Sequence, residues 1–130
     1  AIILSEKLKH LSKWTENKNK VAQRYLNEIK NDKIILPVED SNCYNSYHIF
    51  CVRVNDNTRE NFQEYLNKHG ITTIIHYPIP IHDTQIFDNS DTVYSSLLTD
   101  QYKDKIVSLP MHPYLNDKEL TFIIDKINKF

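Results

Sequence analysis

Apolar residues recur at helical spacing through the first thirty positions of the chain. Successive members of this set lie three or four residues apart, or near multiples of those steps, which is the spacing of one helix face. They are Leu4, Leu8, Leu11, Trp14, Val21, Tyr25 and Ile29. No proline or glycine interrupts the run. The pattern therefore predicts one long helix over residues 2–30, about 40 Å long at 1.5 Å per residue.

Four short apolar runs predict strands. They cover residues 33–37, 47–54, 71–76 and 105–109. Residues 47–54 carry apolar side chains on both faces, which is typical of a central strand that is covered on both sides. Pro78 and Pro80 follow the third run. Because proline has no N–H to donate to a neighbouring strand, we expect the chain there to leave the sheet as an extended segment.

Helical patterns separate these runs. Thr58 stands where it can cap a helix that ends before Gly70. A glycine is favoured at that point because the residue after a helix often takes a positive φ. Residues 92–102 are weakly helical. Asn116 precedes the last helical pattern and Glu119 follows three positions later, which predicts an approximate capping box.

Together these elements predict an α+β fold with a small, mostly antiparallel sheet and helices packed on it. We expect residues 1–30 to form one long helix and residues 31–130 to form one small domain. A helix of that length would project from so small a domain. We therefore expect protein outside this sequence to cover its far end.

Composition and charge exclude several classes of function. The 130 residues include one glycine, where average usage would give roughly nine, so Gly-rich phosphate loops and the G-x-S-x-G nucleophile turn are excluded from this sequence. The formal net charge is −1 with both signs interspersed, which disfavours nucleic-acid binding. No apolar run approaches the ~20 residues that span a bilayer, so no membrane partner is expected. Two cysteines, Cys43 and Cys51, indicate free thiols and a cytoplasmic location.

The run from His76 to His82, which reads HYPIPIH, is the strongest candidate for chemistry. Its two prolines fix the backbone, and its imidazoles can donate or accept hydrogen bonds near neutral pH. In one interpretation the run is a rigid wall that presents two imidazoles and the Tyr77 phenol to a ligand. In the other it is a proline-rich strand exit whose histidines bond to nearby backbone groups. The residues alone leave both open.

A metal site built on this run is disfavoured. The available ligands would be His76, His82, the adjacent Asp83 and the distant His112. Their spacing matches no short zinc motif, and no cysteine lies nearby. We therefore predict no metal ligand.

Three other features have ordinary structural explanations. Cys51 and His48 would point to opposite faces of a strand, so a thiol nucleophile is not expected. Arg53 or Arg59 could hold an anionic group bidentately, but surface ion pairs are the commoner role of such arginines. The simplest interpretation of residues 108–113 is the end of a strand followed by a turn.

Residues 70–82 and 107–113, however, resemble two C-terminal motifs of the DegT/DnrJ/EryC1/StrS sugar aminotransferases. They read GITTIIHYPIPIH and VSLPMHP. Residues 1–11 resemble the start of the family's interdomain helix, which implies that residues 1–30 form a long interdomain helix. Residues 47–50 together with Arg59 resemble the family's central strand and the helix that follows. The resemblance covers essentially the whole chain, with the motifs in the family's order.

The resemblance implies a fold-type I enzyme that uses pyridoxal 5′-phosphate. Such enzymes move an amino group, commonly from glutamate, onto a keto sugar linked to a nucleotide, and they are usually homodimers with active sites at the subunit interface. This chain would be the small C-terminal domain. The cofactor and its Schiff-base lysine would belong to the large domain, so no catalytic or cofactor-binding residue is assigned within this chain.

The resemblance also marks four candidate substrate-binding residues: His76, Tyr77, Pro78 and His82. The chain departs from the family at Gln85, which lies one position later than the family's glutamine, and at Asp100, where the family often has glutamate. The alternative hypothesis is a non-catalytic module of the same fold, either a truncated gene product or a binding or assembly domain. If a large domain belongs with this chain, the apolar side of residues 2–14 should be bare in the chain alone.

Overall fold

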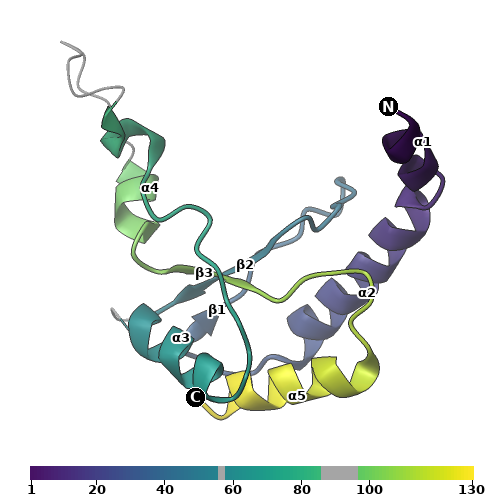
Figure 1. Cartoon of the computed structure of the whole chain (residues 1–130). Helices are drawn as coiled ribbons and strands as arrows, with labels where there is room; N and C mark the ends of the chain where they lie inside the picture. The colour runs from purple at the N-terminus through teal and green to yellow at the C-terminus, as the bar shows by residue number, and fades with distance from the viewer. Residues whose placement is uncertain (56–57, 86–96) are drawn as a thin grey trace.

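The computed structural model describes residues 1–55, 58–85 and 97–130 (Figure 1). Its α-helices are α1 (Ile2–Leu8), α2 (Leu11–Glu28), α3 (Arg59–Lys68), α4 (Leu97–Tyr102) and α5 (Asp117–Asn128), and a 3-10 helix, η1, covers Ile81–Asp83. Its strands are β1 (Ile34–Ile35), β2 (Phe50–Val54) and β3 (Ile106–Leu109). The predicted α+β fold is confirmed.

The strands form one antiparallel sheet in the order β1–β2–β3, with β2 in the centre as expected. Phe50 pairs with Leu109 and Val52 pairs with Val107. Residues directly opposite each other in a ladder share a face, and all four side chains are buried. Helices α2, α3 and α5 supply half of the core residues: Val21, Ala22, Tyr25, Phe62, Leu66, Leu120, Ile123, Ile124 and Ile127.

The predicted single helix over residues 2–30 is wrong, because two helices occupy the range. Between them, the N–H groups of Lys9 and His10 bond to the carbonyl oxygens of Glu6 and Lys7. Bonds to the third residue back are tighter than those of an α-helix. The local tightening divides the helix although no proline or glycine is present. The two helices still form one continuous arm that projects from the sheet (Figure 1).

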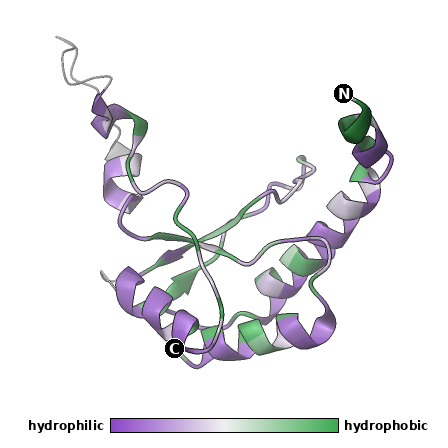
Figure 2. Cartoon of the chain, in the orientation of Figure 1, coloured by the Kyte–Doolittle hydropathy of each residue, from purple (hydrophilic) through white to green (hydrophobic). Residues whose placement is uncertain are grey.

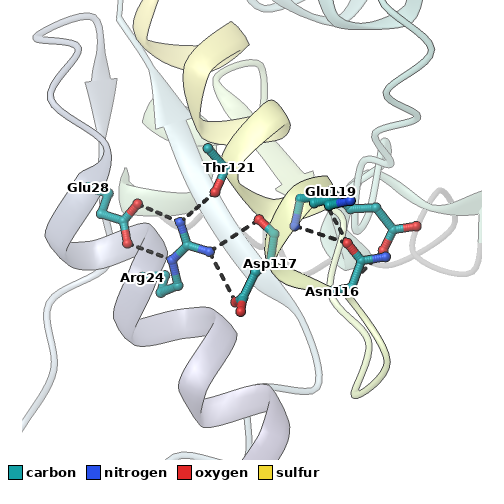
Figure 3. Close-up of polar contacts among 7 residues, drawn as sticks. Arg24, Glu28, Asn116, Asp117, Glu119 and Thr121 are labelled. Carbon is teal, nitrogen blue, oxygen red and sulfur yellow. Dashed lines mark hydrogen bonds and ion pairs between the residues drawn. The ribbon is translucent and has the colours of Figure 1, made fainter.

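The arm is fastened to the rest of the fold at its base. The Asn128 side chain accepts from the Lys30 N–H at 2.7 Å and donates to the Glu28 carbonyl at 2.9 Å, which helps to end α2 there. Arg24 on α2 donates to Glu28 at 2.6 and 2.8 Å and reaches Thr121 on α5 at 2.9 Å (Figure 3). These bonds join α2 to α5 next to the core.

The strands are shorter than predicted. Tyr47 has a φ of 44° and its N–H bonds to the Asn45 side chain, so β2 begins at Phe50 rather than at 47. The predicted strand over residues 71–76 is wrong: of that range, Ile74 alone pairs with the sheet, through a bridge to Ser108. The first predicted run contracts to Ile34–Ile35.

Helix ends agree with the prediction in two of three cases. Gly70 has a φ of +74° after α3, and the Asn116 side chain accepts from the Lys118 and Glu119 N–H groups, completing a capping box at α5 (Figure 3). Thr58 does not cap α3 with its side chain, because its hydroxyl donates to the Asn55 carbonyl instead. Of the helix predicted over residues 92–102, residues 92–96 lie outside the described part.

The apolar side chains at the tip of the arm are bare, as the large-domain hypothesis expects. Ile2 is 87% exposed, Leu4 is 66% exposed and Leu8 is 64% exposed. Figure 2 shows this end of the chain as the most apolar part of the arm. Among the described residues, no helix is both long enough and apolar enough to cross a membrane.

Candidate functional site

The segment after the Ile74 bridge forms one wall of a groove of about 470 Å³. Helix α4 and the start of β3 form the other wall. The lining residues are His76, Tyr77, Ile79, Pro80, Ile81, His82, Leu98, Thr99, Tyr102, Lys103 and Ile106. Three of the four predicted site residues therefore line one groove. Pro78 is exposed and is not among the lining residues.

His76 is held against the sheet. Its Nδ1 lies 2.9 Å from the Ser108 hydroxyl oxygen on β3. The His76 and Tyr77 rings meet edge to face, with centroids 5.6 Å apart and planes at 89°. His76 is half-buried, whereas Tyr77 is 73% exposed. The run thus supplies one fixed imidazole and one phenol that is open to a ligand.

A second hollow of about 130 Å³ lies on the other side of His76. Its lining residues are His48, Ile49, Thr72, Ile74, His76, Ser108, Leu109, Pro110 and Met111. The second sequence motif, residues 107–113, therefore lies beside the first. His76 is the residue that lines both hollows.

His82 belongs to a charged cluster that ties η1 to α4. Its Nε2 lies 2.9 Å from Oδ1 of Asp100 and 3.6 Å from Oδ1 of Asp83. Lys103 Nζ lies 2.8 Å from Asp83 Oδ2 and 3.6 Å from Asp100 Oδ1. The carboxylates around Lys103, above all the hydrogen-bonded Asp83, raise the pKa of its ammonium.

Sequence reasoning missed Lys103 as a member of this cluster. The available signal was its position three residues after Asp100 in a helical pattern, since that spacing places two side chains on one helix surface. Nothing in the pattern shows that η1 lies next to that surface. The cluster forms through the fold and not through local spacing.

The two arginines considered from the sequence fix the far end of α4. The Arg53 guanidinium lies over the Tyr102 ring, 4.1 Å from its centroid. Arg59 Nη1 donates to the Lys103 carbonyl at 2.9 Å, and its Nη2 lies 2.8 Å from Glu60. Both guanidinium groups are thus engaged within the protein, in holding α4 rather than in presenting an anion site.

The charged cluster has the composition of a weak cation site, but the Lys103 ammonium group already lies beside its carboxylates. The ligand atoms of His82, Asp83 and Asp100 lie within 4.8 Å of one another. A metal ion there would compete with the Lys103 ammonium, which already contacts both carboxylates. His76 and His112 do not belong to this cluster among the described residues.

Cys51 is poorly suited to act as a nucleophile. The side chain is half-buried on β2, and burial raises the pKa of its thiol, which disfavours the reactive thiolate. Both cysteines are free thiols, and Cys43 is exposed.

The comparison with known proteins decides the family. The DegT/DnrJ/EryC1/StrS aminotransferase family matches residues 1–128. The chain belongs to this family. The match extends across both sequence motifs, the groove and the projecting arm, so the whole described fold is family structure and not an unrelated domain that carries a short motif.

Three similar proteins show the extent of the likeness. The dTDP-3-amino-3,6-dideoxy-alpha-D-galactopyranose transaminase of Aneurinibacillus thermoaerophilus is 35% identical over 100% of this chain and 35% of its own length. The pleiotropic regulatory protein of Geobacillus stearothermophilus is 31% identical over 100% of this chain and 36% of its own length. The crystal structure of DesV from S. venezuelae, in complex with a ketimine intermediate, superposes with a TM-score of 0.87 at 27% identity, covering 98% of this chain and 34% of that one.

The chain therefore spans about a third of the length of these relatives. The family uses pyridoxal phosphate, but the groove described here does not fit that cofactor. Lys103, the lysine in its lining, is engaged with Asp83 and lies close to Asp100. A phosphate group placed there would meet two carboxylates, which repel it.

Proposed function

We propose that this chain is the C-terminal domain of a pyridoxal-phosphate-dependent aminotransferase that acts on nucleotide-linked keto sugars. The amino donor is glutamate and the intact enzyme is a homodimer. The observation that carries the proposal is the family match over residues 1–128. The names of the dTDP-sugar transaminase and its relatives support the substrate class.

In this proposal residues 1–30 are the interdomain segment and residues 31–130 are the small domain. The exposed apolar side chains of α1 support that division. Ile2, Leu4 and Leu8 each leave most of their surface in water, which gives up roughly 1.5–3 kcal/mol per side chain relative to full burial. The large domain is the partner that buries them, and it holds the cofactor and the lysine that reacts with it.

The small domain contributes one wall of the substrate site and part of the dimer surface, and it is not catalytic alone. His76, Tyr77 and His82 line the groove, and Pro78 holds the backbone between them. Imidazole and phenol groups can bond to the hydroxyl oxygens of the sugar part of a sugar nucleotide. The anchors of α4, at Arg53 and Arg59, keep the opposite wall in place.

The experiment is glutamate-dependent amination of a nucleotide-linked keto sugar by the complete gene product that carries this chain. Tyr77→Phe removes one phenol oxygen from the groove and is expected to raise KM for the sugar nucleotide about fivefold, the effect of one hydrogen bond of about 1 kcal/mol. Tyr114→Phe is the matched control, because Tyr114 is 69% exposed and lies outside the groove.

Two outcomes would count against the proposal. Equal KM values for the Tyr77→Phe and Tyr114→Phe enzymes would remove Tyr77 from the substrate wall. A complete gene product that binds no pyridoxal phosphate and transfers no amino group would favour the alternative, a non-catalytic module of the same fold.

A further inference from the structure

Ser108 is a buried polar residue on the less covered face of the sheet. It is 5% exposed and pairs with Cys51 on β2, so the two side chains share a face. Its backbone exchanges two hydrogen bonds with Ile74, at 2.8 and 3.2 Å. The chain that leads to the candidate site therefore runs alongside Ser108, and the Ser108 hydroxyl oxygen lies 2.9 Å from His76 Nδ1.

The surroundings of Ser108 decide which group gives the proton in that bond. Burial raises the pKa of the Cys51 thiol, so Cys51 keeps its proton at neutral pH. The thiol points that proton toward the Val52 carbonyl, 3.8 Å away. The Ser108 hydroxyl then has one proton and two possible acceptors, the Cys51 sulfur and an imidazole nitrogen. Sulfur is the weaker acceptor, so the hydroxyl donates to His76 Nδ1.

That direction fixes the tautomer of His76. With Nδ1 accepting, a neutral ring carries its proton on Nε2. Among the described residues, Nε2 has no protein hydrogen-bond partner, and no buried side-chain nitrogen or oxygen lacks one. Nε2 is therefore reached by solvent, on a ring that lines both hollows.

We infer that Ser108 is a positioning residue, which holds His76 as the Nε2–H tautomer so that the ring presents an N–H donor to an oxygen of the ligand. Ser108 itself is too buried to bind that ligand. The inference rests on the proposed function for the identity of the ligand, a nucleotide-linked sugar whose sugar ring carries hydroxyl oxygens. The inferred tautomer of His76 does not depend on the proposed function.

The test is nitrogen-15 NMR of the imidazole rings in the 130-residue chain at a pH where His76 is neutral. His76→Asn assigns the signals by their disappearance. In the unaltered chain we expect Nε2 to be the protonated nitrogen and Nδ1 the bare one, with widely separated resonances. A protonated Nδ1 would overturn the inference without any Ser108 variant.

Substitutions at Ser108 test the cause. In Ser108→Ala the two nitrogen resonances of His76 should move toward each other, because the ring loses its fixed partner and samples both tautomers. Ser108→Thr keeps a hydroxyl and should restore the separation. Cys51→Ala keeps the Ser108 hydroxyl and should leave the separation unchanged. Equal separations in Ser108→Ala and the unaltered chain, both with native backbone amide spectra, would refute the positioning role.

These outcomes are distinguishable from failure of the proposed function, because the NMR measurement needs neither cofactor nor turnover. In the complete enzyme, Ser108→Ala should raise KM for the sugar nucleotide and Ser108→Thr should restore it. If the tautomer behaves as inferred and no amino transfer occurs, the proposed function fails alone. If transfer occurs with an unchanged KM, the positioning role fails alone.

Discussion

Tyr25 offers a test of the core through its hydroxyl group. The side chain is fully buried between α2 and the sheet, with its ring 5.0 Å from the Phe50 ring. Its hydroxyl donates to the Pro110 carbonyl at 2.9 Å. Burial raises the pKa of this phenol well above its ordinary value of 10. Tyr25→Phe removes the hydroxyl and the titration together.

Two opposing effects set the magnitude. At neutral pH the variant loses one buried hydrogen bond, which lowers the free energy of unfolding by about 1 kcal/mol. Above pH 10 the unfolded chain releases the Tyr25 proton while the folded chain keeps it. Stability of the unaltered chain therefore falls as pH rises, by about 1.4 kcal/mol per pH unit from this group. The Tyr25→Phe variant has no phenol at this position, so its free energy of unfolding does not fall for this reason.

The assay is urea unfolding followed by far-ultraviolet circular dichroism at pH 7, 10 and 11. We expect the unaltered chain to be the more stable at pH 7 and the difference to close by about pH 11. Other alkaline titrations, including that of Tyr47, whose pKa burial and Glu39 also raise, act on both proteins alike. Tyr44→Phe is the control, because Tyr44 is 78% exposed. A constant difference between Tyr25→Phe and the unaltered chain across this range would refute the reasoning.

Two further substitutions test a helix cap and the projecting arm. Asn116→Ala removes the acceptor for two N–H groups at the start of α5 and should lower the free energy of unfolding by about 1 kcal/mol in urea; an unchanged midpoint would show that the capping box contributes nothing. Leu8→Glu should change the free energy of unfolding of the 130-residue chain by less than about 0.5 kcal/mol, since Leu8 is 64% exposed. In the complete enzyme the same change should lower the melting temperature, because the large domain would bury this side chain. Equal melting temperatures for the complete enzyme with and without this change would argue against burial of the arm.

Much of the fold could be predicted because its signals are local. The capping box at Asn116 uses residues three positions apart, and Gly70 alone supplies the positive φ that ends α3. The tight turn at Lys9 and His10 carries no such signal, since neither residue breaks helices strongly. Tyr47 takes a positive φ against its own preference, held by contacts with Asn45 and Glu39.

The candidate site could be predicted only in part for a related reason. The run from His76 to His82 is visible as a motif, but the reduction of the predicted strand 71–76 to one bridge is not. The partners of these histidines come from elsewhere in the chain. Ser108 reaches His76 from the neighbouring strand β3, and Asp100 reaches His82 from α4. No periodicity encodes which distant segment lies beside a loop.

The central claim is that this chain is part of a sugar aminotransferase, and product formation tests it most directly. The complete gene product would be incubated with pyridoxal phosphate, glutamate and a nucleotide-linked keto sugar, and the products analysed by mass spectrometry. The proposal predicts a nucleotide-linked amino sugar together with an equal amount of 2-oxoglutarate, and neither from the 130-residue chain alone. Unchanged keto sugar across dTDP- and UDP-linked substrates, from a protein that is folded and supplied with cofactor, would contradict it.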